Sequence, residues 1–288
     1  MKFLSSHLYS LKLKEGVVSA SEYRGGALSL KEFSKFKHGD GNIAEKYGLS
    51  LYQLFMEHYT EFLVSDSERL IIVCPVNKGV TPTIKFFQLF INSHLSRLGK
   101  LPIKRFEMKF IGGGITRNDY ASLSKKDREN ILGDGMFVFD QKFSRGKRVV
   151  VIDDLRVTGT YENTIKKMLE AAGAECLIFL YVVHVPREVI EKRRDVESVL
   201  DRYYINNLTR LGEVLLADGF ILNQRFCKFL LTQKDLKALR DFLRMLPNKT
   251  IREIYALSVN EGYGLIEVYE KAFSVLESVL EESCCLNL

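Results

Sequence analysis

The sequence predicts an α/β fold in which a parallel, twisted sheet is flanked by helices, with an N-terminal segment before it and a helical addition after it. The first observation is an alternation between about residues 68 and 185, where apolar runs of strand length follow segments with helical spacing. Such apolar runs are typical of strands buried on both faces, and their alternation with helices indicates a parallel sheet with right-handed crossovers. The second observation is the change after Pro186, where Leu, Lys and Glu recur at helical spacing.

The individual elements follow from the same patterns. Strands are expected at residues 70–74, 103–110, 136–139, 148–153 and 176–183, and helices at 50–63, 82–98, 160–172, 235–246 and 264–282. Ser50 is placed to cap the first helix, Pro82 fits the first turn of the second, and Gly173 can end the third.

These patterns divide the chain into three parts. Residues 1–67 form an N-terminal segment, residues 68–185 the α/β core, and residues 186–288 the helical addition, with short extended pieces near residues 203–207. The ligand of such a core is expected at the carboxyl ends of its strands.

The composition is that of an ordinary globular protein, with 46% hydrophobic and 27% charged residues. No apolar run reaches the ~18 residues of a membrane helix, and residues 1–13 lack a continuous apolar segment, so we expect neither a membrane partner nor a secretion signal. The five cysteines contain no C-x-x-C pair, which argues against a zinc site or a disulfide framework and favours a cytoplasmic protein.

The balance of 42 basic and 36 acidic residues leaves a net charge of +6, which suits an anionic ligand. The basic clusters at residues 35–38 and 125–126 are too short for the concentrated stripe of a nucleic-acid-binding protein. We therefore expect a small anion rather than a nucleic acid as the partner.

The segment Val149–Thr160 (VVVIDDLRVTGT) combines features that suit a sugar phosphate. Four apolar residues predict a buried strand, Asp153 and Asp154 follow at its carboxyl end, and Thr158-Gly159-Thr160 opens the next helix. A helix N-terminus with free N–H groups holds a phosphate, and a glycine lets the backbone approach it closely. Carboxylates accept strong hydrogen bonds from vicinal hydroxyls. The segment therefore predicts a site for ribose 5-phosphate.

Two other interpretations compete with this one. A buried strand followed by a solvated turn and a capped helix explains each feature singly, but not their conjunction at fixed spacing. A Walker B acid after an apolar strand would need a G-x-x-x-x-G-K-[ST] loop elsewhere in the chain, and the sequence has none.

The same segment resembles the 5-phosphoribosyl 1-pyrophosphate motif of the type I phosphoribosyltransferases, which is four apolar residues, two acids, three variable residues and Thr-Gly-Thr. The resemblance implies that Asp153 and Asp154 contact the ribose 2- and 3-hydroxyls, take part in catalysis and hold Mg²⁺ indirectly. It also implies a 5-phosphate loop formed by Leu155, Arg156, Val157, Thr158, Gly159 and Thr160.

The resemblance further implies two loops that act on pyrophosphate. After the first core strand, Lys78 supplies charge and Gly79 lets backbone N–H groups form an anion nest, although an ordinary turn with a surface lysine is the alternative. The polar segment 112–130 would close over the reacting centre and exclude water. Arg117 is its candidate catalytic residue, and Lys109 is a second candidate for pyrophosphate binding. A surface loop without a function is the alternative for this segment.

A polar cluster at residues 34–41 (SKFKHGDG) precedes the core. Members of the family recognise the nitrogenous acceptor with a variable hood, and the resemblance makes Lys37, His38 and Asp40 candidates for it. An exposed turn is the alternative. The C-terminal part could complete the hood, pack against a second subunit in a homodimer, or dock another protein.

The activity that the resemblance implies is transfer of the 5-phosphoribosyl group from 5-phosphoribosyl 1-pyrophosphate to a nucleobase-like acceptor, with release of pyrophosphate and Mg²⁺ as cofactor. Orotate, a purine or an unusual acceptor all remain open. The alternative is a regulatory protein on the same fold that senses the ligand without turnover, because a fold does not determine a function.

Overall fold

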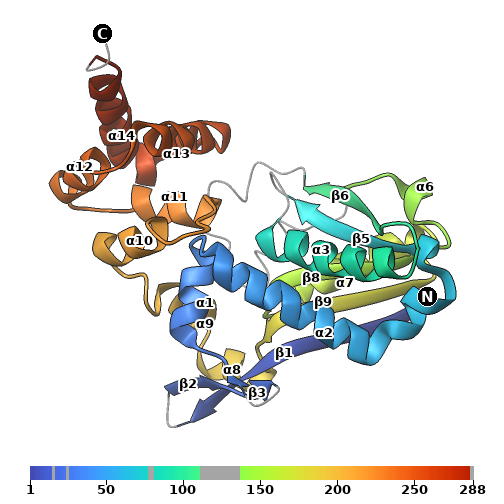
Figure 1. Cartoon of the computed structure of the whole chain (residues 1–288). Coiled ribbons are helices and arrows are strands. Elements are labelled where there is room, and N and C mark those ends of the chain that lie inside the picture. The colour runs from blue at the N-terminus through green and yellow to red at the C-terminus, as the bar shows by residue number, and fades with distance from the viewer. Residues whose placement is uncertain (15–16, 24–25, 77–80, 111–136, 286–288) are drawn as a thin grey trace. The chain divides into compact units, whose positions relative to one another are not determined.

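A computed structural model of the chain describes residues 1–14, 17–23, 26–76, 81–110 and 137–285 (Figure 1). These residues form two compact units. Unit 1 takes its described residues from Met1–Ser29, Ile43–Gly113 and Tyr120–Ser198, and unit 2 consists mainly of Leu30–Asn42 and Val199–Leu288. The boundaries of these units differ from the predicted ones, because residues 1–29 belong to the same unit as the α/β core. Within the described ranges, no helix is long and apolar enough to cross a membrane.

Unit 1 is built on a seven-stranded sheet in the order β2-β1-β9-β8-β5-β6-β7. The five strands from β1 to β6 in that order run parallel, while β2 and β7 pair antiparallel at the two edges. The predicted fold class is therefore confirmed. The strands of this sheet are β1 (Lys2–Lys14), β2 (Val17–Ala20), β5 (Leu70–Val76), β6 (Lys104–Phe110), β7 (Phe137–Val138), β8 (Arg148–Arg156) and β9 (Cys176–His184); β3 (Glu22–Tyr23) and β4 (Gly26–Ala27) form a separate pair.

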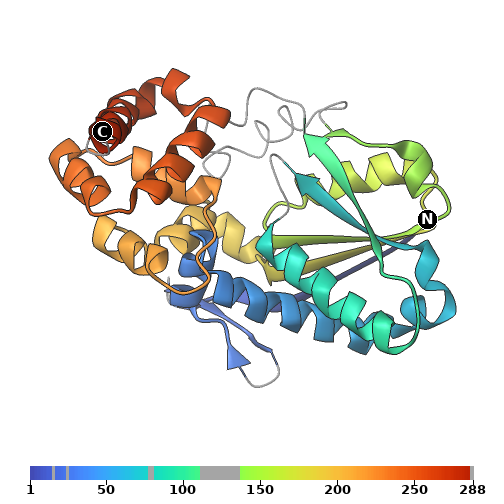
Figure 2. The same cartoon turned by 45° about the horizontal axis from the view of Figure 1, so that its top comes forward.

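The connections of this sheet create a switch point between β5 and β8. From β5 the chain passes through α3 (Pro82–Arg97) to β6 on one side, and from β8 it passes through α7 (Thr160–Ala171) to β9 on the other side. Right-handed crossovers in opposite directions place their helices on opposite faces. Figure 2 shows α3 and α2 (Gly41–Asp66) on one face and α7 on the other. Ligands of such sheets bind outside the carboxyl ends of the strands at this point.

The central strand β8 is buried on both faces, as its apolar run predicts. Val149 and Val151 form one cluster with Ile165 and Leu169 of α7. Their neighbours Val150 and Ile152 are equally buried. Because successive side chains of a strand point to opposite faces and both faces are covered here, all four consecutive side chains must be apolar.

Strand β1 was not among the strands that the apolar pattern predicts. It pairs in parallel with β9 from Lys2 opposite Cys176 to Ser10 opposite His184. Serines and a histidine interrupt its apolar residues, and only part of it, including Leu8 and Leu11, is buried. A strand near the edge of a sheet tolerates these polar residues because it packs less completely than β8 does.

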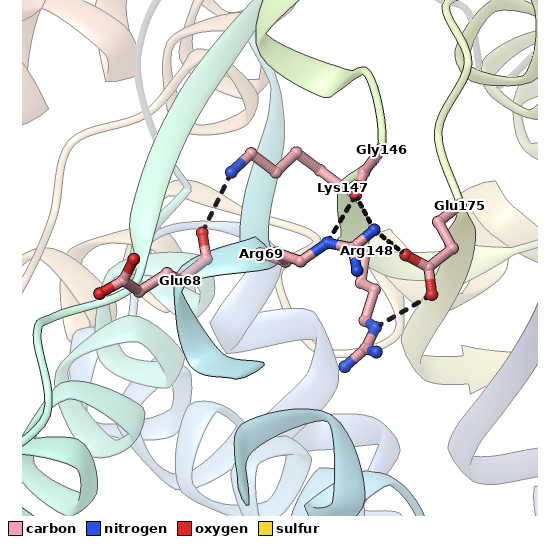
Figure 3. A network of polar contacts seen from close by, with 6 residues as sticks. All are labelled: Glu68, Arg69, Gly146, Lys147, Arg148 and Glu175. Carbon is pink, nitrogen blue, oxygen red and sulfur yellow. Dashed lines mark hydrogen bonds and ion pairs between the residues drawn. The ribbon is translucent and has the colours of Figure 1, made fainter. Parts of the chain in front are cut away.

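The amino ends of β5, β8 and β9 are connected by a network of polar contacts (Figure 3). Arg69, which precedes β5, donates from Nε and Nη2 to the carbonyl of Gly146 at 3.1 and 2.8 Å. It also pairs with Glu175, whose second oxygen lies 3.4 Å from Nε of Arg148. The guanidinium of Arg69 thus connects the segment before β5 with the segments before β8 and β9. These contacts lie at the end of the sheet opposite to the switch point.

Unit 2 is helical around a core of its own. Phe226, Leu230, Leu243 and Leu276 are among its fully buried side chains. The helices predicted at residues 235–246 and 264–282 are confirmed as α12 and α14, whereas residues 203–207 form no strand. The helices are α1 (Leu30–Lys37), α10 (Leu208–Leu215), α11 (Gln224–Leu231), α12 (Leu236–Arg244), α13 (Asn248–Asn260) and α14 (Glu267–Cys285), while α9 (Val196–Arg202) spans the unit boundary.

Helix α2 begins earlier than predicted. It starts at Gly41, so Ser50 lies inside the helix rather than at its N-cap. The Ser50 hydroxyl donates to the carbonyl of Lys46, four residues earlier, at 2.9 Å. A serine in a helix interior satisfies its hydroxyl in this way and gives no start signal.

In unit 2, Ser34 and His38 of the polar cluster are buried. The Ser34 hydroxyl donates to the carbonyl of Asp201 at 2.5 Å and accepts from the backbone N–H of Ile205 at 3.1 Å. His38 is 1% exposed, donates from Nδ1 to the carbonyl of Ser34 at 2.8 Å and packs edge-on against Phe229. Burial is the main cause that lowers the pKa of His38 to about 4. The imidazole is therefore neutral at physiological pH.

This burial predicts a pH-dependent stability. In the unfolded chain His38 takes up a proton near the ordinary histidine pKa of 6.5, but in the folded protein only near pH 4. The stabilisation is complete above pH 6.5 and is lost as the pH falls towards 4, by about 3 kcal/mol in total. Urea unfolding of the full chain between about pH 4 and 7.5 should show this loss in the wild type and a smaller one in His38→Gln. The exposed His58 provides the control His58→Gln, and an unchanged pH dependence in His38→Gln would contradict the assignment.

Candidate functional site

The predicted sugar-phosphate segment lies at the switch point of unit 1. Strand β8 extends through Asp153 and Asp154 as far as Arg156, three residues beyond the predicted end, because Leu155 and Arg156 still pair with Val183 and His184 of β9. The chain then turns through residues 157–159 into α7. Both aspartates are half-buried at the carboxyl end of the central strand.

The turn after β8 requires a glycine. Gly159 is the N-cap of α7 and has φ +71° and ψ +3°, a left-handed conformation that side chains with a Cβ disfavour. The Thr158 and Thr160 hydroxyls lie 2.9 Å apart, and the backbone N–H of Thr160 points at the Thr158 hydroxyl at 3.4 Å. The first bond of the helix runs from Asn163 N–H to the Gly159 carbonyl at 2.9 Å. The backbone N–H groups that precede Asn163 cannot bond within the helix, because no earlier helical carbonyl exists for them, and an anion site requires such N–H groups.

A pocket of about 200 Å³ opens at this place. The acid pair and the turn thus face the same cavity, in the arrangement that the sequence predicts. Its lining consists of Asp153, Asp154, Leu155, Arg156, Val157, Thr158, Gly159, Tyr161, Glu162, Tyr181 and Glu197. The assignment of these residues to ribose and 5-phosphate stays a prediction.

Arg156 and Glu162 form an ion pair in this lining. Arg156 Nε and Nη2 donate to the two carboxylate oxygens of Glu162 at 2.8 and 3.1 Å, which is the bidentate geometry of strong pairs. The Tyr181 hydroxyl donates to Glu162 at 2.8 Å, and Arg156 Nη1 donates to His184 Nε2 at 3.0 Å. The hydrogen bonds with Glu162 are the first cause of the raised pKa of Arg156.

The neighbours of this pair are held in single protonation states. Burial, followed by the charge of Glu162, raises the pKa of Tyr181, so the phenol stays protonated. Burial also lowers the pKa of His184, with His7 and Arg156 as further causes. A neutral His184 can accept the hydrogen bond from Arg156 through Nε2, and its ring lies 4.9 Å from that of His7.

The sequence placed Arg156 in the predicted 5-phosphate loop without assigning a contact to its side chain, and it did not indicate Glu162, Tyr181, His184 or Glu197. One local signal for Glu162 exists. It lies in the first turn of α7, where acidic residues are common because they interact favourably with the helix N-terminus. Tyr181 and His184 reach the ion pair from β9, which lies beside β8. The sequence around them gives no signal of this contact.

Of the candidates for pyrophosphate binding, Lys109 is the one within the described residues. Lys109 is near the end of β6, where its backbone pairs with Val76 of β5 and Val138 of β7. Lys78, Gly79 and Arg117 lie outside the described residues. All four remain predictions.

The hood candidates belong to unit 2. Lys37 ends α1, His38 is buried as described above, and Asp40 is 7% exposed and forms a backbone bridge with Phe220. A role of Lys37, His38 and Asp40 in acceptor recognition stays a prediction.

The described residues contain no group of three or more His, Cys, Asp or Glu side chains that could hold a metal ion. Asp153 and Asp154 supply carboxylate oxygens, the ligand type that suits Mg²⁺. A hard cation at this pocket would thus take further ligands from water or from a bound phosphate.

A mostly parallel sheet with an acid pair and a threonine-lined helix start at its switch point is the architecture of the type I phosphoribosyltransferases. The chain matches the family model described as PRTase ComF-like over residues 19–276, where PRTase denotes phosphoribosyltransferase, and it belongs to this family. This match confirms the resemblance that Val149–Thr160 indicates. Family and fold support phosphoribosyl transfer as the general class of chemistry. The comparison with curated proteins found no match.

Three of the solved structures with which the chain shares similarity are the following. Hypoxanthine-guanine phosphoribosyltransferase of L. donovani is 11% identical, with 53% of this chain and 78% of that chain covered and a TM-score of 0.35. Purine phosphoribosyltransferase of Pyrococcus horikoshii is 16% identical, with 50% and 86% covered and a TM-score of 0.28. Glutamine phosphoribosylpyrophosphate amidotransferase of B. subtilis, complexed with ADP and GMP, is 19% identical, with 59% and 35% covered and a TM-score of 0.31. The family assignment rests on the family model and not on these similarities.

The left-handed Gly159 predicts a selective effect on anion binding. In Gly159→Ala the left-handed turn becomes strained, and the new Cβ would lie 3.4 Å from Nη2 of Arg156, at the limit of ordinary contact. We expect affinity for ribose 5-phosphate to fall roughly 10-fold or more, together with about 1–2 kcal/mol of stability. The control is Gly99→Ala, also at positive φ in unit 1 but with no atom within 4 Å of its Cβ. Calorimetric titration should show unchanged affinity in the control, and equal affinities in both variants would contradict the prediction.

Proposed function

We propose that this chain is a phosphoribosyltransferase that transfers the 5-phosphoribosyl group from 5-phosphoribosyl 1-pyrophosphate to a nucleobase-like nitrogen acceptor and releases pyrophosphate. The observation that carries the proposal is the pocket at the switch point, which the acid pair and the glycine turn line together. Membership of the PRTase ComF-like family supports the same class of chemistry.

Each part of the pocket has a task in this proposal. Asp153 and Asp154 accept hydrogen bonds from the ribose 2- and 3-hydroxyls, and residues 155–160 hold the 5-phosphate through backbone N–H groups, threonine hydroxyls and the N-terminal charge of α7. Fixing the sugar at both ends orients C1 towards the acceptor, which lowers the entropic part of the barrier.

The reaction is a substitution at C1 of the ribose. The bond from C1 to the pyrophosphate oxygen breaks, the bond from C1 to the acceptor nitrogen forms, and the nitrogen loses its proton. Positive charge develops on the sugar in an oxocarbenium-like transition state, and the carboxylates of Asp153 and Asp154 stabilise it electrostatically. One of these carboxylates can also accept the proton of the acceptor. In this scheme Lys78, Gly79, Lys109 and Arg117 bind the departing pyrophosphate.

The charges of the pocket lining support Mg²⁺ as a cofactor. Among the described residues, the lining contains the carboxylates of Asp153, Asp154, Glu162 and Glu197 and one guanidinium, that of Arg156. An anionic ligand needs additional positive charge in such surroundings. Mg²⁺ bound to the pyrophosphate would neutralise that group, while Asp153 and Asp154 hold the ion through water or through the sugar hydroxyls.

We further propose that the protein acts in the cytoplasm. Cys176 and Cys227 are free and buried, which agrees with a reducing compartment. The second candidate function is a sensor that binds the same ligand without turnover. The pocket supports both candidates, because the residues proposed to bind pyrophosphate mostly lie outside the described residues.

Turnover distinguishes the two candidates. The full chain with Mg²⁺, 5-phosphoribosyl 1-pyrophosphate and a panel of acceptors, including orotate, adenine, guanine and hypoxanthine, should release pyrophosphate with at least one of them. Release is measured with a coupled phosphate assay. Tight binding of the ligand without release for any acceptor would favour the sensor.

The acid pair predicts the loss of sugar binding on neutralisation. The double variant Asp153→Asn, Asp154→Asn keeps the side-chain shapes but removes both charges, so affinity for ribose 5-phosphate should fall roughly 100-fold or more. The exposed Asp195, which pairs with Arg193, provides the control Asp195→Asn. Calorimetry gives the affinities and circular dichroism the fold. Unchanged affinity in the folded double variant would contradict the assigned role.

A further inference from the structure

Arg156 is the only cationic side chain that lines the pocket, among the residues that the structure describes. The other charged groups of the lining are the carboxylates of Asp153, Asp154, Glu162 and Glu197. A phosphate group placed among them meets strong repulsion unless positive charge lies beside it. The N-terminus of α7 contributes only about half a charge. Among the side chains of the lining that the structure describes, Arg156 is thus the one whose charge attracts a phosphate at this turn.

The guanidinium of Arg156 has donors left for a ligand. It carries five N–H groups, of which one on Nε and one on Nη2 reach Glu162 and one on Nη1 reaches His184. The remaining two, one on each terminal nitrogen, have no hydrogen-bond partner within the described part of the chain. Nη2 lies beside the glycine turn, 3.4 Å from the position of a Cβ on Gly159. A free N–H group is therefore next to the turn that would receive the phosphate.

The position of this guanidinium is determined by residues behind it. Glu162 is 4% exposed and receives two hydrogen bonds from Arg156 and one from the Tyr181 hydroxyl. A buried carboxylate with three donors cannot change rotamer without losing them. It also fixes the orientation of the planar guanidinium, so little side-chain entropy is left to lose when a ligand binds.

We propose that the Arg156 side chain binds the 5-phosphate of the ligand directly, and that Glu162 and Tyr181 are positioning residues that hold its guanidinium at the turn. This inference rests on the proposed function, because it takes a ribose 5-phosphate as the ligand. It assigns Glu162 a task that its charge alone would contradict: an isolated carboxylate at the start of α7 repels a phosphate, whereas a carboxylate paired with Arg156 directs a cation towards it.

The first test measures affinity for ribose 5-phosphate by calorimetry on the full chain. Arg156→Gln should weaken binding roughly 10- to 100-fold, the range for a hydrogen bond to a charged group. Arg156→Lys keeps the charge but not the planar fork, so its loss should be smaller, roughly 3- to 10-fold. The control is Arg187→Gln, which breaks the exposed ion pair of Arg187 with Glu191 in the same unit. Its affinity should equal that of the wild type.

The second test separates positioning from simple charge effects by a double-mutant cycle. Glu162→Gln removes a negative charge near the phosphate, so electrostatics alone predicts tighter binding. If Glu162 positions Arg156, the variant binds roughly 3- to 10-fold more weakly. In the Arg156→Gln background the same change should leave affinity equal or raise it. Tyr181→Phe should weaken binding in the wild-type background only.

The outcomes distinguish this inference from the proposed function. If the wild type does not bind ribose 5-phosphate, the proposed function fails and this inference with it. If the wild type binds, the acid-pair variant does not, and folded Arg156→Gln and Arg156→Lys bind as well as the wild type, only the role of Arg156 is overturned. Tighter binding of Glu162→Gln in the wild-type background would overturn the positioning role. Circular dichroism and thermal unfolding verify that each variant is folded.

Discussion

The pairing of β8 between β5 and β9 is the constraint on which the rest of unit 1 depends. A strand buried on both faces has no room for polar side chains, so the run from Val149 to Ile152 is apolar and the first carboxylates lie nearer the carboxyl end of the strand, where burial is incomplete. Because β5 and β8 send their crossover helices in opposite directions, that end is also the switch point. The pocket is thus a consequence of the strand order.

The pocket combines requirements that conflict electrostatically. A diol is best held by carboxylates, whereas a phosphate is best held by positive charge, and under the proposed function both bind within a few residues of each other. In that proposal β8 and α7 separate the two tasks: Asp153 and Asp154 lie near the carboxyl end of the strand, and the left-handed Gly159 is the N-cap of the helix. The ion pair of Arg156 with Glu162 then compensates the acid that lies nearest to the helix start.

The two ends of the sheet differ in their chemistry. At the amino ends of β5, β8 and β9, Arg69 bonds to the carbonyl of Gly146 and pairs with Glu175, and these contacts connect the three strands. At the carboxyl ends, half-buried carboxylates and an incompletely paired guanidinium border a cavity. Groups that satisfy one another stabilise a fold, and a guanidinium that retains donors towards a cavity can bind a ligand.

The apolar runs and their spacing were sufficient to predict the parallel core, the helices after it and the segment Val149–Thr160, because burial on both faces and a phosphate-binding turn each demand a local pattern. Strand β1 was missed because its serines do not give that pattern. Ser50 was misread because its hydroxyl bonds to the preceding turn of α2. Only the tertiary structure decided that Tyr181 and His184 stand behind Arg156, and that His38 is buried, because contacts between residues distant in the chain leave no periodic trace in the sequence. The sequence alone determined which residue types lie at the carboxyl end of β8, because they are neighbours in the chain, and the fold decided which side chains from other elements contact them.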